Sequence, residues 1–382
     1  MGKNRVHYVV EKNHVLYRIS RMKLDLLLFL FCIIVIGACT KSEAPVTNSE
    51  VINKLIDNSE YKSIDLNTEV ADTIFAELFI TNEENLNIED SIFIKRIKSI
   101  DAIGNNLLVS MQVAPFLLVF DKNGNFQEAP ISTGRGPGEL SGLSHVIITD
   151  DKIFATDGPN ARINVYDFDL NFLFSEVNLE IGYGTNFVNG FNWENRLFYP
   201  STYQSENSIT ALNFSDSLSI DTTFHPKFIP IGMQPAPVNF YSGTTDFDGN
   251  VYVANKGLFY IVKYNGDFLP IIFYEIKDDS MTQYLSDPEP IPTSNTRVGV
   301  TDIITHLDFI SEDEMLLSTF RTMSILTKNS NGGFDVLSRH VIKDKSDSSL
   351  IYLEKFAFDE EYVYLASQFS SDIYRFSIES LR

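Results

Sequence analysis

The feature that most constrains the fold of this chain is a pair of short strands that recurs six times. In each copy an apolar strand precedes a second strand with alternating apolar residues and a tight polar turn, as in "DKIFATD" followed by "RINVYDFDLNF". The first strands of the six units occupy residues 105–111, 151–157, 195–201, 249–255, 313–319 and 361–367. Their starts are 46, 44, 54, 64 and 48 residues apart. Because no segment beyond about residue 70 keeps a 3.6-residue period, the pattern predicts an all-β fold.

A spacing of roughly 40 to 50 residues is typical of the four-stranded blades of β-propellers. The sixth unit reaches the end of the sequence just after its third strand, and an incomplete blade would expose a sheet edge. The segment "DTIFAELFI" (72–80) is the natural candidate for the missing outer strand. We therefore predict a six-bladed β-propeller over residues 70–382, closed by an N-terminal strand that joins the last blade. The second unit is expected to contain strands near 143–149, 153–157, 162–168 and 172–177.

The N-terminal segment "MKLDLLLFLFCIIVIGAC" (22–39) is predicted to be a targeting sequence rather than part of the fold. Its apolar run is shorter than the roughly 20 residues that span a bilayer, and it suits the core of a signal peptide. We expect a signal peptide over residues 1–38, of which residues 1–21 are an over-extended start. The segment that begins "TKSEAPVTNSE" is polar and contains proline, so residues 39–69 are predicted to form a polar tether.

The ending "IGAC" of that segment resembles the bacterial lipobox, in which an aliphatic residue and two small residues precede a cysteine. The resemblance implies that lipid is attached to Cys39 and that the chain is cleaved before it. An ordinary secretory signal with a chance cysteine is the alternative. The lipid would place the protein at the bacterial outer membrane, and whether it faces the periplasm or the surface stays open.

The formal net charge of −21 excludes whole classes of partner. A nucleic-acid-binding protein needs a basic face, so no nucleic acid is expected, and anionic lipid headgroups are disfavoured for the same reason. Contact with the membrane is therefore expected only through the lipid on Cys39. The two cysteines, Cys32 and Cys39, both precede the predicted propeller, which excludes disulfides and thiolate metal sites from the folded domain.

The second unit contains "FATDGPNARINVYDFDLNFL", which resembles an NHL repeat in its Asp157, Asn160, Arg162–Ile163 and Tyr166–Asp167. The segment "GRGPGE" (134–139), which follows "FDKNGNF", is similar to the corresponding segment of the Bacteroidetes six-bladed β-propeller lipoproteins, a group of NHL/TolB-like propellers. This resemblance covers most of residues 70–382 together with the lipobox. It implies a propeller and a lipid anchor but indicates little about activity.

Residues 134–139 do not fit a phosphate-binding loop. A Walker loop needs Gly-Lys-Ser/Thr at the start of a helix, and a dinucleotide fingerprint needs a third glycine where Glu139 stands. One interpretation is a tight crossover between two blades, with Arg135 and Glu139 paired to neighbouring groups. In the other, both residues line the mouth of the channel and bind a ligand. The loops expected on the same face add further ligand-binding candidates, namely Asp157, Arg162, Tyr203, Lys256 and Arg321.

His145 and His306 fall on predicted inner strands, so both could point into the channel. Two histidines and an acid could hold a metal, as in NHL-type lyases, but no H-x-H or H-x-x-x-H spacing supports this. We therefore expect no metal and no other cofactor. No G-x-S-x-G elbow is present either. Of the aromatic residues, Trp193 and Tyr203 are the best candidates for stacking on a sugar.

These observations favour an envelope protein that acts as a binding module for a peptide, a glycan or a partner protein. The alternative is an enzyme of the lyase or hydrolase type that uses Arg135, His145, Arg297 and His306 in the channel. A purely structural component of the envelope is a third possibility.

Overall fold

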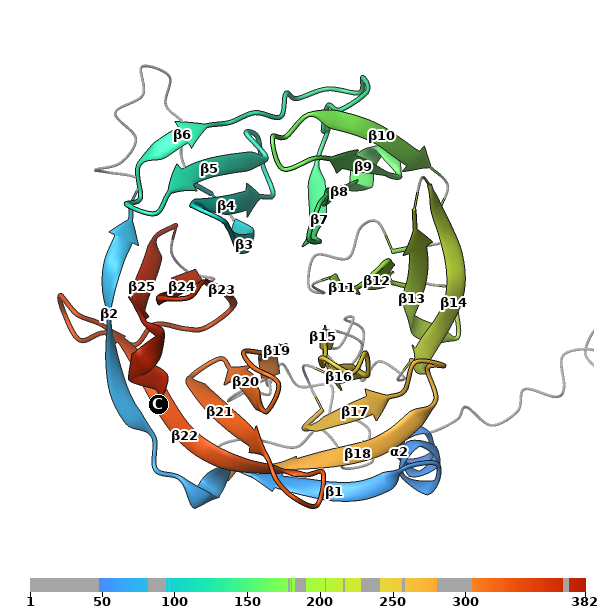
Figure 1. The fold of residues 1–382 in the computed structure, drawn as a ribbon, viewed down its shortest axis with the longest axis vertical. Coiled ribbons are helices and arrows are strands. Elements are labelled where there is room, and N and C mark those ends of the chain that lie inside the picture. The colour runs from blue at the N-terminus through green and yellow to red at the C-terminus, as the bar shows by residue number, and fades with distance from the viewer. Residues whose placement is uncertain are drawn as a thin grey trace, which may run out of the picture. The chain divides into compact units, whose positions relative to one another are not determined.

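The structure is a computed structural model, and its described residues form a ring of six radial sheets (Figure 1). It describes residues 48–81, 94–95, 97–177, 179, 181–182, 190–202, 204–215, 217–227, 241–255, 258–279, 304–366 and 371–382. Residues 48–382 make up one compact unit. The predicted signal peptide and Cys39 lie outside the described residues. No helix in the described ranges is long and apolar enough to cross a membrane.

Each sheet is a propeller blade whose strands follow one another from the central channel outward. The first three blades are β3 (Ile97–Ile103), β4 (Asn106–Met111), β5 (Leu117–Asp121) and β6 (Phe126–Glu128); β7 (Leu143–Ile148), β8 (Ile153–Asp157), β9 (Arg162–Tyr166) and β10 (Phe172–Val177); and β11 (Phe191–Trp193), β12 (Arg196–Pro200), β13 (Asn207–Phe214) and β14 (Leu218–Pro226). The 3-10 turn η2 (Gly158–Asn160) joins β8 to β9.

The fourth blade holds β15 (Tyr241–Thr245), β16 (Val251–Asn255), β17 (Tyr260–Tyr264) and β18 (Pro270–Lys277). The fifth holds β19 (Ile304–Phe309), β20 (Glu314–Thr319), β21 (Thr322–Lys328) and β22 (Phe334–Asp344), and the sixth holds β23 (Lys355–Phe358), β24 (Tyr362–Ala366) and β25 (Ile373–Ser377) before η4 (Ile378–Leu381). All six predicted units are therefore present, and the predicted six-bladed propeller is confirmed.

The turn residues explain why the strands end where they do. At the β5–β6 hairpin the Asp121 carboxylate accepts hydrogen bonds from the backbone N–H groups of Asn123 and Asn125, at 2.9 and 2.8 Å. Gly124 has a φ of +83°, a conformation that costs glycine nothing and strains other residues. A short polar segment with glycine thus reverses the chain and lets the next apolar strand pair back.

The predicted closure of the ring is confirmed by β2 (Asp72–Ile80). The second half of β2 pairs antiparallel with β25, with Glu77 opposite Arg375 and Leu78 opposite Tyr374, and so supplies the fourth strand of the last blade. The first half pairs parallel with β22 of the fifth blade over residues 72–76. One strand therefore fastens two neighbouring blades, which the sequence had not predicted.

The polar tether expected over residues 39–69 is wrong for the part that the structure describes. Residues 48–68 form the helix α2 (Asn48–Asp57), the strand β1 (Glu60–Asp65) and the turn η1 (Leu66–Thr68). The strand β1 adds a fifth, parallel strand to the outer edge of the fourth blade. The cause is a small set of apolar residues within a polar segment, all of which are buried: Ile52, Leu55, Ile64 and Leu66.

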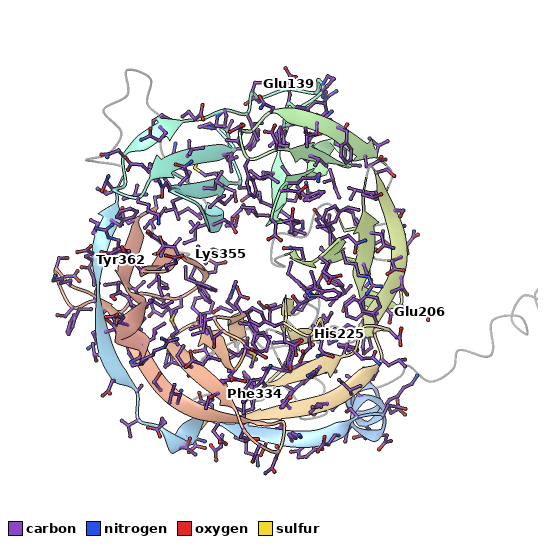
Figure 2. The ribbon with its side chains drawn as sticks, in the orientation of Figure 1. Glu139, Glu206, His225, Phe334, Lys355 and Tyr362 are labelled. Atoms are coloured by element: carbon purple, nitrogen blue, oxygen red, sulfur yellow. The ribbon has the colours of Figure 1, made fainter. Side chains whose placement is uncertain are left out.

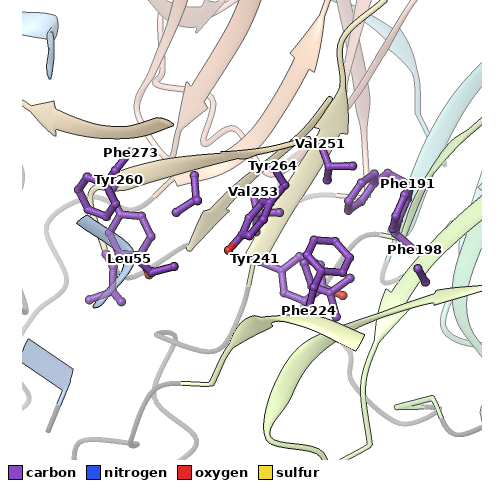
Figure 3. Close-up of a cluster of buried hydrophobic side chains, with 14 of the residues drawn as sticks. Leu55, Phe191, Phe198, Phe224, Tyr241, Val251, Val253, Tyr260, Tyr264 and Phe273 are labelled. Atoms are coloured by element: carbon purple, nitrogen blue, oxygen red, sulfur yellow. The ribbon is translucent and has the colours of Figure 1, made fainter. Parts of the chain in front are cut away.

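The core lies between neighbouring blades rather than in the channel. The faces of the third and fourth blades, for example, meet in one cluster of buried aromatic and aliphatic side chains (Figure 3). The Phe191 and Phe198 rings stack with centroids 4.6 Å apart, and the Phe224 and Tyr264 rings meet in a T-shaped arrangement with centroids 5.2 Å apart. Aromatic pairs of this geometry add to the stability gained from buried area, so each blade is held by its neighbours.

Candidate functional site

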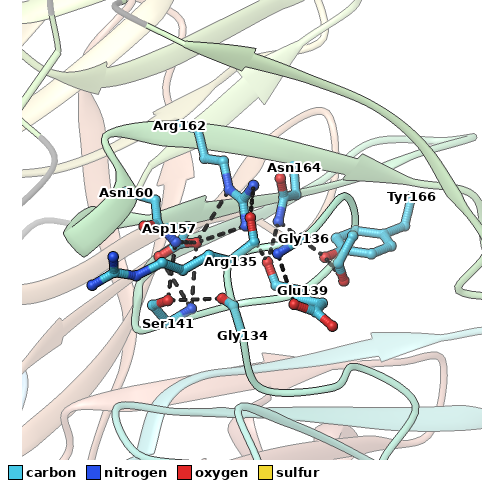
Figure 4. Close-up of polar contacts among 11 residues, drawn as sticks. Gly134, Arg135, Gly136, Glu139, Ser141, Asp157, Asn160, Arg162, Asn164 and Tyr166 are labelled. Atoms are coloured by element: carbon cyan, nitrogen blue, oxygen red, sulfur yellow. Dashed lines mark hydrogen bonds and ion pairs between the residues drawn. The ribbon is translucent and has the colours of Figure 1, made fainter.

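The glycine-rich crossover before the second blade is held by side chains of the blade that follows it (Figure 4). The Glu139 carboxylate accepts a hydrogen bond from the Gly136 N–H at 2.7 Å, which closes the loop on itself. The Glu139 carbonyl accepts from Arg162 Nη2 at 2.6 Å and from Asn164 Nδ2 at 2.9 Å. The Tyr166 hydroxyl donates to the Gly138 carbonyl at 3.0 Å. The loop is therefore fixed mainly through its backbone.

The side chains that hold the crossover, namely Asp157, Asn160, Arg162, Asn164 and Tyr166, are called the cradle below. Asp157 lies at its centre and is fully buried. Its carboxylate accepts hydrogen bonds from Asn160 Nδ2 at 2.7 Å and from Arg162 Nε at 3.2 Å, and the backbone N–H of Ser141 lies 3.3 Å away. The Arg162 guanidinium also donates to the carbonyl of Arg135 at 3.1 Å. The residues that resemble an NHL repeat thus bind the preceding crossover, because buried charges need partners.

The glycines of the crossover serve close packing. A Cβ atom at Gly134 would overlap the Glu139 carboxylate, and one at Gly138, where φ is +71°, would press on the Phe172 ring. Glu139 lies at the outer part of the ring, whereas Lys355 lies at its inner margin (Figure 2). Arg135 is exposed, and its guanidinium points away from the cradle (Figure 4). These positions favour the structural crossover over a role for this loop at the channel mouth.

The central channel contains a cavity of about 360 Å³ to which every blade contributes its inner strand. One residue from each blade illustrates the lining, in chain order Ala102, Val146, Phe191, Thr245, Asp308 and Phe356. A second cavity of about 80 Å³ adjoins it, and the two share Asp101 and His306. The smaller cavity lies at the first residues of the inner strands and the larger one at their last residues, so the two follow one another along the channel.

The channel brings together a half-buried acid from the first blade and a buried lysine from the sixth. Asp101 on β3 accepts a hydrogen bond from the Ser99 hydroxyl at 2.8 Å. Burial raises the pKa of Asp101 to about 6, while that hydrogen bond and the charge of Lys355 act in the opposite direction. Lys355 on β23 is only 6% exposed, and burial lowers the pKa of its ammonium group, which the charges of Glu354 and Asp101 oppose.

His306 and Asp308 occupy alternate positions of β19 and face the same channel. His306 Nε2 lies 3.9 Å from Asp308 Oδ2, and the imidazole packs on the Phe356 ring with centroids 3.9 Å apart. The Thr244 hydroxyl donates to Asp308 Oδ1 at 2.8 Å. The Asp308 carboxylate is thereby oriented by a neighbouring blade.

The other predicted site residues are distributed unevenly. His145 lines the smaller cavity together with His306, but its side chain is 4% exposed and its ring meets Tyr199 of the third blade at 6.3 Å. Arg321 is exposed at the β20–β21 turn. Trp193 is half-buried, and the close approach of Gly249 to its ring makes it part of a blade contact. Outside the described residues lie Tyr203, Lys256 and Arg297.

Sequence reasoning missed four charged residues of the channel, Lys98, Asp101, Asp308 and Lys355. A usable signal existed for two of them, because "SIDAI" and "THLDF" place an acid at an alternating position of an inner strand. Across the described ranges, no group of three or more His, Cys, Asp and Glu residues is arranged to hold a metal ion. What the channel offers instead is hydrogen bonding and charge along its inner strands.

The comparisons with known proteins agree with this architecture. Residues 52–289 match the sequence model of a protein family described as "6-bladed beta-propeller". A search of curated proteins found no match. The matched region begins within α2 and runs past the fourth blade, so it includes the N-terminal strands as well as the first four blades.

Solved structures from Bacteroides share the fold at low sequence identity. A Bacteroides fragilis protein described as exported has a TM-score of 0.50 and 16% identity, with 84% of this chain and 98% of that chain covered. A member of the DUF4221 family from Bacteroides vulgatus has a TM-score of 0.51 and 9% identity, with 80% and 96% covered. An inactive virginiamycin B lyase variant from Staphylococcus aureus reaches 0.43 at 10% identity, with 76% and 98% covered. The likeness to the two Bacteroides structures concerns the fold alone, and nothing is argued from the match at 0.43.

Proposed function

Because the chain belongs to the 6-bladed beta-propeller family, we propose that it acts as a binding module whose central channel engages a peptide, a glycan or a segment of a partner protein. The observation that carries this proposal is the cavity of about 360 Å³ to which all six blades contribute. Small-molecule sites commonly have volumes of roughly 300 to 1,000 Å³ with a few convergent polar groups. Asp101, His306 and Asp308 supply such groups here.

The experiment that tests channel binding compares the protein with a variant whose channel is filled. Thr245 lines the cavity, so Thr245→Trp should block it, whereas Thr73→Trp places the same ring on the exposed outer face of β2. Each protein is incubated with a low-molecular-weight envelope extract, washed and denatured, and the released molecules are identified by mass spectrometry. A species released by the wild type and by Thr73→Trp, but not by Thr245→Trp, is expected. Identical release from all three proteins would contradict channel binding.

We further propose that the protein is held at the outer membrane by lipid on Cys39. The support is the lipobox-like ending "IGAC" and the short stretch between Cys39 and the first described residue of α2. Two or more acyl chains would make such an anchor durable. Metabolic labelling with an alkyne fatty acid should tag the wild type but not Cys39→Ser, and the variant should leave the membrane fraction. Labelling that persists in Cys39→Ser would disprove the anchor.

A second candidate, an enzyme of the lyase or hydrolase type, is favoured by one observation. His145, His306 and Asp101 all line the smaller cavity, so two potential bases and an acid lie near one another. Arg135, which that hypothesis also requires, lies in the crossover and lines neither cavity. Elemental analysis of the purified protein, with loss of metal in a His145→Ala/His306→Ala double variant, would favour the enzyme. A metal-free protein that still releases a channel ligand favours the binding module.

A further inference from the structure

A cavity of about 380 Å³ lies on the third blade, at the end where β11 turns into β12 and β13 into β14. None of the described residues that line it also lines either cavity of the channel. Its volume is within the range of roughly 300 to 1,000 Å³ that small-molecule sites commonly have. The third blade therefore offers a candidate binding site of its own.

The strand register places an aromatic ring and three polar side chains in one row across this end of the blade. Trp193 is opposite Arg196, Arg196 is opposite Asn213, and Asn213 is opposite Ser219. Residues directly opposite one another in antiparallel strands have their side chains on the same face, with Cβ atoms about 4.5 to 5.5 Å apart. All four residues line the cavity. An indole, a guanidinium, an amide and a hydroxyl thus follow one another from the inner strand to the outer strand.

The two largest side chains of this row are held by the fourth blade. A Cβ atom at Gly249 would lie 2.3 Å from Trp193 Cζ2, so the indole rests on the backbone of that glycine. Arg196 Nη1 donates to the Gly266 carbonyl at 3.1 Å, and its Cζ lies 5.1 Å from the centroid of the Phe268 ring. Side chains that are fixed before a ligand arrives lose little conformational freedom on binding, so the row is preorganised.

Glu194 adds an exposed acceptor beside the row. It occupies the turn between β11 and β12 and lines the cavity. Its φ is +48°, in the left-handed region where glycine is favoured and other residues are destabilised. Residues in strained backbone conformations are concentrated at binding sites. The glutamate at this position is therefore better explained by what its carboxylate binds than by the turn itself.

The hydrogen-bonding groups favour a neutral ligand that carries hydroxyl groups. An amide and a hydroxyl can each donate and accept, a guanidinium only donates, and a carboxylate only accepts. The charge of Arg196 is already met by Asp221, with Nε 3.4 Å from Oδ2, and the Glu194 carboxylate would repel an anion. A sugar ring has an apolar C–H face, which suits an indole, and hydroxyl groups along its edge, which suit the polar row.

We infer that the third blade carries a site for a neutral sugar, whose ring stacks on Trp193 and whose hydroxyl groups bond to Glu194, Arg196 and Asn213. This site is additional to the proposed channel function and does not depend on it. The sequence singled out Trp193 as a candidate for stacking on a sugar, and the cavity gives that ring its polar neighbours.

The test uses the fluorescence of Trp193, which is the only tryptophan of the chain. The full chain is titrated with cellobiose, maltotriose, mannobiose and N,N′-diacetylchitobiose, with digalacturonic acid as an anionic sugar and with trialanine as a peptide. A neutral sugar should shift the emission to shorter wavelength and protect the indole from quenching by acrylamide. The inference is overturned if no neutral sugar changes the emission, or if digalacturonic acid or trialanine binds more tightly than every neutral sugar.

Two variants keep the tryptophan and remove polar groups of the site. Glu194→Gly should weaken sugar binding by at least about 10-fold, because bonds to a charged group are lost, while its Tm should not fall, because glycine accepts the positive φ. Ser348→Gly is the matched control, since Ser348 is exposed and has a φ of +61°, and it should bind sugar as the wild type does. Asn213→Ala should weaken binding by about 3- to 10-fold, whereas Asn106→Ala, at the exposed first residue of β4, should not.

The remaining outcomes separate this site from the channel. Wild-type affinity in both Glu194→Gly and Asn213→Ala would overturn the site, and so would a neutral sugar that binds in calorimetry without changing the fluorescence of Trp193. If Glu194→Gly does not fold, as judged by circular dichroism, Asn213→Ala decides. Failure of this inference leaves channel binding intact, because the extract experiment with Thr245→Trp tests that function separately.

Discussion

Ring closure by β2 can be tested by joining it covalently to β25. Leu78 and Tyr374 are opposite one another in the antiparallel pair, and opposite Cα atoms in such pairs lie about 4.5 to 5.5 Å apart. That separation falls within the range that a disulfide accepts. Leu78 is 47% exposed, so its replacement removes little packing. We expect Leu78→Cys/Tyr374→Cys, with serine at Cys32 and Cys39, to oxidise to a single intramolecular disulfide.

The expected stabilisation follows from the length of chain that the bridge encloses. The bridge closes a loop of roughly 300 residues, for which the chain-entropy relation gives about 6 kcal/mol as an upper estimate. A matched control, Thr327→Cys/Asp335→Cys, joins opposite residues of the β21–β22 hairpin and encloses only about 8 residues, which gives about 2.5 kcal/mol. The bridge at the ring closure should therefore stabilise the protein by about 3 kcal/mol more than the control.

The measurement is urea unfolding of each double variant in its oxidised and reduced forms, followed by tyrosine fluorescence. Using each protein as its own reference cancels the effect of the substitutions themselves. Engineered disulfides often stabilise less than the relation gives, so the comparison between the two bridges decides. If the bridge at β2 fails to form while the hairpin bridge forms, or stabilises no more than the hairpin bridge, the closure described here is wrong.

Three further predictions concern single residues. Gly249→Ala should lower the free energy of unfolding in urea by more than about 2 kcal/mol, because the new Cβ would overlap the Trp193 ring at a φ of +80°; a smaller loss would show that the ring moves. Asp157→Asn should cost about 3 kcal/mol by the same assay, because it leaves the buried Arg162 guanidinium without its carboxylate, whereas the exposed Asp169→Asn should cost almost nothing. Burial lowers the pKa of His225 to about 4, so the unfolded chain binds more protons between pH 4 and 6.5. Stability measured by Tm should therefore rise with pH in that window, and His225→Gln should flatten the slope; an unchanged slope would refute the assignment.

The blades could be predicted because their signals are local and repeated. An apolar strand such as residues 153–157 must be followed by a turn and a second apolar strand if both are to be buried, and the turn residues mark the reversal. The pairing of β2 with the last blade followed from the missing fourth strand. The parallel pairing of β2 with β22 could not be predicted from the sequence, because the same strand residues can pair in either direction.

The segment 48–68 was misjudged because it has few apolar residues among many polar ones. Ile52 and Leu55 lie one helical turn apart, which is too short a pattern to stand out from a polar linker. Ile64 and Leu66 are buried only because the outer edge of the fourth blade lies beside them. Tertiary contacts, rather than local propensity, fix this part of the chain.

In the candidate site, some residues belong to a sequence motif, whereas others are brought together only by the fold. Asp157 and Arg162 were recognisable because they belong to a motif, yet the motif describes how a blade holds its crossover. Asp101 and Lys355 belong to no motif. They lie more than 250 residues apart in sequence and meet only because the first and sixth blades are neighbours in a closed ring.

The inner strands that line the channel are short, which limits how many residues each blade can place against a ligand. β11 has three residues and β23 has four, and their buried residues, such as Phe191 and Phe356, pack against other side chains of the ring. Each blade therefore contributes only two or three consecutive residues to the lining of the larger cavity. Because the faces between blades hold the ring together, substitutions such as Asp308→Asn should change what the channel binds with little effect on stability. Substitutions in the cradle of Asp157 should do the reverse.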